Sequence, residues 1–238
     1  MTSLNNLRIK IFADGADLSS MVALAAQPHI TGLTTNPTLM RQAGIVDYKA
    51  FAADVLAAIP DKPISFEVFA DEPVEMLRQA QLISSWADNV YVKVPVTTTD
   101  GASCGPIIRE LSADGVKLNV TALMTPAQTE SVAADLAAGV PAIISVFAGR
   151  IADTGRDPVP LMQECVELLS GRAEVELIWA SPRELLNIFQ ADAIGCDIIT
   201  VTPDVLKKLE LVGKDLDLFS LETVQMFYTD ASTAGFQL

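Results

Sequence analysis

The feature that most constrains the fold is an alternation of two kinds of segment along the whole chain. Eight short runs rich in Val and Ile alternate with longer stretches in which Ala and Leu recur at helical spacing. Some runs, such as PAIISVF, are apolar throughout, which is typical of parallel strands covered on both faces. The predicted strands are residues 7–13, 30–34, 63–69, 90–95, 116–121, 142–147, 174–179 and 197–201.

Helix boundaries are marked by capping residues. Thr125-Pro126 has the pattern of an N-cap followed by Pro at the first helical position, and Gly139 is the predicted end of that helix. Glu72-Pro73 predicts the start of another helix, which ends before Asp88. The helices therefore fall between the predicted strands.

Eight strand–helix units within 238 residues leave little room for a second domain. We therefore predict an α/β protein with one (β/α)8 TIM barrel over residues 1–238. An open, doubly wound parallel sheet is the competing arrangement. Residues 215–238 form an apolar C-terminal extension, predicted to be helical and to pack on a neighbouring subunit.

Composition excludes several classes of partner. The formal net charge is −14, so the chain repels a polyphosphate backbone, and we expect no nucleic-acid binding and no binding to anionic membranes. No apolar run reaches the roughly 18 residues that cross a bilayer, and the N-terminus lacks a signal-peptide pattern. Three scattered cysteines with one histidine give no metal-site spacing and are expected to be buried small residues. We expect a cytoplasmic protein without a metal.

In a barrel of this kind, functional side chains lie at the carboxyl ends of the strands. Few polar residues of this sequence satisfy that condition. They are Asp14, Thr34, Thr35, Asn36, Glu67, Lys93, Asn119, Thr121, Ser145, Arg150, Ser181 and Arg183.

Lys93 is the most informative of them, because it lies between valines in the predicted strand NVYVKVPVT. A lysine is rarely buried unless it is paired. One interpretation is an interior ammonium neutralised by carboxylates. The other is a Schiff-base nucleophile, since desolvation favours the neutral amine and lowers the lysine pKa.

Asp14 and Glu67 are the candidate carboxylates, since each ends an apolar strand. They can serve as helix-start acids, as partners of Lys93, or as a pair for general acid–base chemistry. Thr121 either orients a water beside Glu67 or caps a helix.

Arg150 and Arg183 follow the sixth and seventh predicted strands, each a few residues after a serine. They are either solvated charges or a local positive pocket suited to a phosphate. The chain has no G-x-G-x-x-G or P-loop motif, so no nucleotide is implied.

Five segments occur in order between about residues 9 and 203: GLTTNPTLM, VYVKVPVT, KLNVTALMTPAQ, IISVFAGRIAD and WASPREL. Together they resemble the signature stretches of the transaldolase family. That family comprises class I, Schiff-base aldolases on a (β/α)8 barrel, including small transaldolases and fructose-6-phosphate aldolases.

The resemblance implies a role for each matching residue. Lys93 would form the imine, Asp14 would handle the proton of a substrate hydroxyl, and Glu67 with Thr121 would bind the catalytic water. The implied substrate contacts are Thr35, Asn36, Asn119, Ser145, Phe147, Arg150, Ser181 and Arg183.

The implied activity is transfer of a dihydroxyacetone unit between sugar phosphates, without a cofactor, in the pentose phosphate pathway. Glu at position 67 and Phe at position 147 are the residues found in family members that act as transferases. A Phe at position 147 cannot protonate the enamine. The alternatives are cleavage to free dihydroxyacetone, and a barrel that binds a sugar phosphate without turning it over. The resemblance also implies a homo-oligomer.

Departures from the family pattern lie near the predicted anion pocket. Pro182 stands where the family usually has an aromatic residue, and Trp179 is bulkier than expected. The same arginine pair would also accept a sulfonated sugar.

Overall fold

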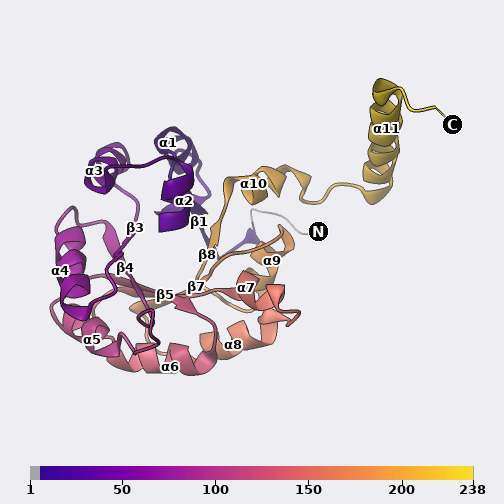
Figure 1. The fold of residues 1–238 in the computed structure, drawn as a ribbon. Helices are drawn as coiled ribbons and strands as arrows, with labels where there is room; N and C mark the ends of the chain where they lie inside the picture. The colour runs from indigo at the N-terminus through magenta and orange to yellow at the C-terminus, as the bar shows by residue number, and fades with distance from the viewer. Residues whose placement is uncertain (1–5, 238) are drawn as a thin grey trace.

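The computed structural model describes residues 6–237 and consists of a closed barrel of eight parallel strands (Figure 1). Residues 1–5 and 238, which belong to the predicted range 1–238, lie outside the described residues. The strands follow one another around the barrel in chain order, and β1 pairs with β8 to close it. The (β/α)8 prediction is therefore confirmed, and the open sheet is excluded.

Helices connect the strands and form the outer layer (Figure 1). The elements are β1 Lys10–Asp14, α1 Leu18–Ala25, β2 Ile30–Thr34, α2 Pro37–Gln42, α3 Tyr48–Ala58, β3 Ile64–Glu67, α4 Pro73–Ser84, β4 Val90–Pro95, α5 Gly105–Ala113, β5 Leu118–Leu123, α6 Pro126–Asp135, β6 Ala142–Val146, α7 Ala148–Asp153, α8 Pro158–Leu168, β7 Val175–Trp179, α9 Leu186–Ala193, β8 Ile198–Val201, α10 Pro203–Leu206, the 3₁₀ helix η2 Lys207–Leu211 and α11 Leu216–Ala234.

The capping residues act largely as the sequence predicts. Thr125 and Gln128 form a reciprocal capping box at the start of α6, and the Glu72 side chain caps α4. The predicted end of α6 at Gly139 is wrong. The helix stops at Asp135 because Leu136 already has extended backbone, and Gly139 (φ 81°) lies in the turn that leads to β6.

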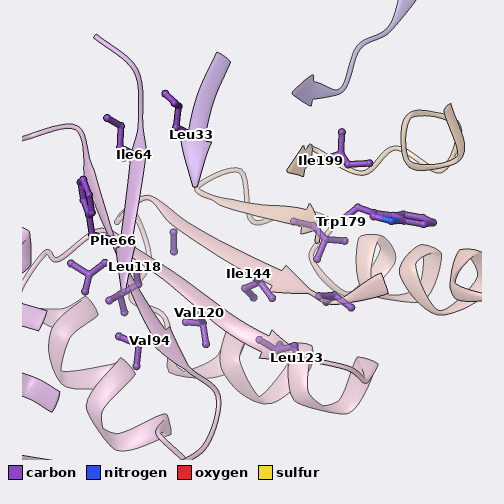
Figure 2. Close-up of a cluster of buried hydrophobic side chains, with 14 of the residues drawn as sticks. Leu33, Ile64, Phe66, Val94, Leu118, Val120, Leu123, Ile144, Trp179 and Ile199 are labelled. Carbon is purple, nitrogen blue, oxygen red and sulfur yellow. The ribbon is translucent and has the colours of Figure 1, made fainter. Parts of the chain in front are cut away.

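Two apolar cores flank the barrel wall. The outer core fills the space between strands and helices, and Figure 2 shows strand residues that contribute to it. These are Leu33, Ile64, Phe66, Val94, Leu118, Val120, Leu123, Ile144, Trp179 and Ile199. The inner core is smaller and consists of Phe12, Ile143, Ile178, Ala180 and Ile198, with Tyr91 and Phe147 packed against it. The three cysteines are buried, as expected.

The inner core supports a polar layer above it. Side chains that face the same side of a strand recur every second residue. Two residues beyond Phe12, Tyr91 and Ile143 on the same strands come Asp14, Lys93 and Ser145. The period therefore places polar groups inside the barrel, at its carboxyl end, on an apolar floor.

Helix α11 lies apart from the barrel, to which a short segment after η2 connects it (Figure 1). Asp215 caps its start, and all its residues are exposed or half-buried. Its exposed side chains include Leu218, Leu221, Val224 and Phe227. No helix within residues 6–237 is both long and apolar enough to cross a membrane.

A close contact in the inner core gives a stability test. A Cβ at Gly32 would lie 2.5 Å from the ring of Phe12, which fills the barrel floor. We expect Gly32→Ala to lower the free energy of unfolding by about 1–3 kcal/mol, since the core is overpacked. Urea denaturation measures the difference. Gly15→Ala is the control, because its Cβ would be 4.0 Å from Met21, and an equal loss in both variants would contradict the argument.

Candidate active site

A cavity of about 540 Å³ opens at the carboxyl ends of the strands, above the apolar floor. Every strand contributes to its wall, either by its last residues or by the segment that follows it. The cavity contains two carboxylates, Asp14 and Glu67, and three cationic groups, Lys93, Arg150 and Arg183. Charged groups from remote parts of the sequence thus converge on one pocket.

All but one of the predicted site residues line this cavity. They are Asp14, Thr34, Asn36, Glu67, Lys93, Asn119, Thr121, Ser145, Phe147, Arg150, Ser181 and Arg183. Thr35 is the exception, because its fully buried hydroxyl donates to the carbonyl of Ser65 (2.9 Å) on β3. Its main-chain carbonyl contributes instead, as an acceptor for Lys93.

Lys93 lies on β4 with its ammonium held by two oxygen atoms. Nζ donates to the carbonyl oxygen of Thr35 (3.0 Å) and lies 3.2 Å from Oε2 of Glu67 on β3. The residue is 7% exposed. A buried ammonium requires a counter-charge and hydrogen-bond acceptors, and both are present. The amine is thereby fixed at the cavity wall beside a carboxylate that can take its proton.

Asp14 ends β1 among polar side chains of the cavity. Its carboxylate accepts from the Thr34 hydroxyl (2.8 Å) and makes a long contact with Nδ2 of Asn36 (3.5 Å). Burial raises the pKa of Asp14, while the nearby charge of Lys93 and the Thr34 hydrogen bond act in the opposite direction. The Thr34 hydroxyl is itself hydrogen-bonded to that of Thr200 on β8. A carboxylate with a raised pKa is a stronger base once ionised.

Asn119 on β5 has a fixed amide orientation. Its Nδ2 donates to Oγ of Ser65 (2.9 Å), and its Oδ1 accepts from Oγ of Ser145 (2.7 Å). This chain crosses from β3 through β5 to β6. The second N–H of the amide is not used by these contacts and is available to a bound polar group.

Thr121 presents a buried hydroxyl at an irregular point of the barrel. Pairing between β5 and β6 shifts register between Val120 and Leu123, and Ala122 has φ 68°. Within residues 6–237, Oγ1 of Thr121 has no hydrogen-bond partner although the residue is 2% exposed. A buried hydroxyl without a protein partner suits a bound water or substrate group.

Two arginines line the cavity where β6 and β7 end. The Arg150 guanidinium is 5.3 Å from the ring centroid of Phe147, a cation–π geometry. The Arg183 guanidinium forms a two-point ion pair with Asp153, with Nε–Oδ1 at 3.0 Å and Nη2–Oδ2 at 2.5 Å. The hydrogen bond from Arg183 lowers the pKa of Asp153. Asp153 therefore orients Arg183 and offsets part of its charge.

A backbone contact joins the first turn of α7, which carries Arg150, to the loop that carries Arg183. The Gly149 N–H donates to the carbonyl of Ala180 (3.2 Å), and a Cβ at Gly149 would lie 1.5 Å from the carbonyl oxygen of Ser181. Ser181 has φ 57°, a conformation that non-glycine residues seldom adopt. Glycine at 149 is thus required for α7 to meet the loop after β7.

Sequence reasoning missed three residues that support the site: Ser65, Thr200 and Tyr48. Ser65 and Thr200 are polar residues in apolar strands, Ser65 two positions before Glu67, so alternation could have indicated both. Tyr48 is at the start of a helix and carries no such signal; its hydroxyl bonds to the backbone of Glu67. Within the described residues, no group of three His, Cys, Asp or Glu side chains could hold a metal ion.

The fold and site together define a (β/α)8-barrel protein with a buried lysine beside a half-buried carboxylate at the wall of an open cavity. A family model described as transaldolase/fructose-6-phosphate aldolase matches residues 11–238. The chain belongs to this family.

Curated relatives agree with that assignment. A probable transaldolase from Dehalococcoides mccartyi is 36% identical over 202 residues, which cover 84% of this chain and 90% of the relative. A probable transaldolase from Hyphomonas neptunium is 34% identical over 234 residues, covering 97% of this chain and 100% of the relative.

Solved structures with low sequence identity support the fold. A dihydrodipicolinate synthase from Rhodopseudomonas palustris has a TM-score of 0.59 at 17% identity, covering 92% of this chain and 81% of that one. A 2,3-dimethylmalate lyase has a TM-score of 0.55 at 15% identity, covering 98% and 86%. At this identity the likeness concerns the barrel alone.

The raised pKa of Asp14 predicts how stability depends on pH. The folded state holds the Asp14 proton more tightly than the unfolded state does, so this group's contribution is greatest below the ordinary aspartate pKa near 4 and is lost as pH rises through the folded-state pKa. We expect Asp14→Asn to be more stable than the parent at pH 7, with the difference shrinking toward pH 4.

Urea denaturation at several pH values measures this difference. Asp17→Asn is the control, since hydrogen bonds from Ser19 and Ser20 lower the pKa of Asp17 and give the opposite sign. A stability difference for Asp14→Asn that does not change with pH would contradict the assignment.

Proposed function

We propose that this protein transfers a dihydroxyacetone unit from a ketose phosphate to an aldose phosphate, through a Schiff base on Lys93. The proposal includes a place in cytoplasmic carbohydrate metabolism, in the pentose phosphate pathway. The observation that carries it is the position of Lys93 Nζ, buried at the cavity wall 3.2 Å from the Glu67 carboxylate. A lysine that serves only as a structural counter-charge does not require an open cavity above it.

The first half of the reaction forms the imine. Lys93 gives one proton to Glu67, and its lone pair attacks the ketone carbon C2. A proton then moves from the attacking nitrogen to the C2 oxygen, which gives a neutral carbinolamine. The carbinolamine loses its hydroxyl as water, with the proton supplied by Glu67 through a water held by the Thr121 hydroxyl. The product is a protonated imine. The unpartnered Thr121 Oγ1 supports this assignment of the water site.

The second half breaks the C3–C4 bond. The Asp14 carboxylate takes the proton of the C4 hydroxyl, the C4 oxygen forms an aldehyde, and the bonding electrons move into the imine to give an enamine. The aldose phosphate leaves. Asn36 and Asn119 hold the three-carbon unit on Lys93 until an acceptor aldehyde enters and the steps reverse. The raised pKa of Asp14 suits this proton transfer.

Phe147 favours transfer over release. Free dihydroxyacetone forms only when the enamine carbon is protonated before an acceptor arrives. Phe147 lines the cavity and has no acidic proton, so it cannot supply one. The enamine is therefore expected to persist until the acceptor binds.

The anionic group of the substrate is assigned to the far side of the cavity. Arg150, Ser181 and Arg183 lie there together, and their donors suit three equivalent anionic oxygens. Because Asp153 already occupies two donors of Arg183, the remaining guanidinium hydrogens and Arg150 would contact the ligand. A sulfonate presents the same number of oxygens as a phosphate and is the competing ligand.

Trapping the imine tests the proposal. We expect incubation with fructose 6-phosphate and sodium borohydride to leave a reduced sugar adduct on Lys93, seen by intact mass and peptide mapping, and Lys93→Met to give none. Without an acceptor, we expect enamine accumulation and little free dihydroxyacetone. Rapid release of dihydroxyacetone would favour the aldolase instead. An adduct with dihydroxyacetone but not with fructose 6-phosphate would show that the lysine reacts and that the anion pocket takes a different group. No adduct with either compound would favour a barrel that binds a sugar phosphate without turning it over.

We also propose that α11 packs on another copy of this chain. Its support is the set of apolar side chains that the helix exposes, including Leu221, Val224 and Phe227. We expect the full chain to be oligomeric in sedimentation analysis and Leu221→Glu with Phe227→Glu to dissociate it. Thr229→Glu is the control for added charge, because Thr229 is exposed on a different side of the same helix from Phe227, and it should leave the oligomer intact. A parent chain that sediments as a monomer would contradict this proposal.

A further inference from the structure

We propose that Tyr48 is a positioning residue for this site. Its hydroxyl takes the place of a neighbouring strand at the unpaired end of β3, where it binds the backbone of Glu67, and so keeps Glu67 and Lys93 in their reactive arrangement. This assigns a role in catalysis to a helix residue outside the cavity wall. The effect on turnover rests on the proposed function, whereas the effect on the Glu67 backbone rests on the geometry of the hydrogen bonds alone.

The Tyr48 hydroxyl makes two hydrogen bonds to one residue. It donates to the carbonyl oxygen of Glu67 (2.9 Å) and accepts from the Glu67 N–H (2.8 Å). Both groups belong to the backbone at the last position of β3. A single side-chain oxygen therefore satisfies the donor and the acceptor that a neighbouring strand would normally satisfy.

The register of the barrel explains why Glu67 needs this partner. Thr34 pairs with Ser65, and the Thr35 N–H donates to the Ser65 carbonyl (3.2 Å). Continuing the parallel ladder by two residues would join the Glu67 N–H to the Thr35 carbonyl, and the Glu67 carbonyl to the N–H of residue 37. Residue 37 is proline, which has no N–H, so the ladder cannot continue.

The interruption leaves the Thr35 carbonyl for Lys93. Its oxygen, the one that the ladder would have given to Glu67, accepts from Lys93 Nζ at 3.0 Å. By taking up the Glu67 N–H, Tyr48 removes the competitor for this acceptor. The same hydroxyl thus fixes the backbone that carries the Glu67 carboxylate and preserves the second anchor of the lysine.

Tyr48 is itself held rigidly. It begins α3, whose N-cap is Asp47, and its ring packs edge-on against Phe66 and Phe69 and tilted against Trp86. Burial raises the pKa of the Tyr48 hydroxyl, so it stays protonated and able to donate through the neutral range. The contact does not change with pH where the protein would be assayed.

The matched pair of variants is Tyr48→Phe and Trp86→Phe. Tyr48→Phe removes one oxygen atom and keeps the ring. Trp86→Phe disturbs the same aromatic cluster, but within residues 6–237 the Trp86 indole N–H makes no hydrogen bond, so only packing is lost. An effect that Tyr48→Phe produces but Trp86→Phe lacks is therefore assigned to the Tyr48 hydroxyl.

The first readout is backbone amide exchange at residue 67, measured by mass spectrometry of fragments or by nuclear magnetic resonance. We expect Tyr48→Phe to speed exchange of the Glu67 N–H about 10- to 100-fold, and Trp86→Phe to leave it within a few-fold. Equal exchange in Tyr48→Phe and the parent would overturn the inference. This readout needs no substrate, so it decides the matter even if the imine chemistry fails.

The second readout is turnover. We expect Tyr48→Phe to lower kcat about 10- to 100-fold with KM changed less than about threefold, since a displaced catalytic group affects the reaction more than binding. Trp86→Phe should keep kcat within about threefold even if its Tm falls further. Parallel losses in both variants would reduce Tyr48 to a packing residue and overturn the role. If the parent itself forms no adduct on Lys93, the proposed function fails, and amide exchange alone judges the positioning.

Discussion

The site depends on keeping one ammonium group buried inside the barrel, next to its apolar inner core. Lys93 stands directly above the inner core, where an unpaired charge would cost several kcal/mol. Glu67 supplies the charge and Thr35 the acceptor, and both come from strands on one side of the lysine. The counter-charge and the acceptor are thus requirements of burying the lysine, whatever else they do in the site.

Regular strand geometry and local irregularity contribute differently to this arrangement. The two-residue period of the strands places Asp14, Lys93 and Ser145 on the inner face without further instruction. The lysine contact with Thr35 and the hydroxyl of Thr121, unpaired within residues 6–237, arise where regular pairing stops, at the end of β2 and at the shifted register of β5. There, main-chain and hydroxyl oxygens have no strand partner and are free to bind a lysine or a ligand.

Much of this could be predicted from the sequence, since the decisive signals are local. Apolar runs located the strands to within a few residues, and a lysine between valines identified the centre of the site. The end of α6 and the buried side chain of Thr35 were not predictable in this way. Helix α6 stops before its glycine because Leu136 leaves helical geometry, and whether a threonine at a strand end faces the cavity depends on the neighbouring strand. Tyr48 shows the limit most clearly, because its role depends on a ladder that a proline elsewhere interrupts.

The contact between Gly149 and the Ser181 carbonyl has a consequence for altering which ligands the cavity accepts. A helix and a loop that touch through their backbones cannot be moved apart by exchanging side chains, so the arginine end of the pocket behaves as a rigid wall. The opposite rim includes Asn36 and Gln42, and among the described residues the main chain of residues 36–42 makes no hydrogen bond to another loop. Selection for larger or differently shaped ligands should therefore enrich changes on the β2 side and leave the arginine side intact.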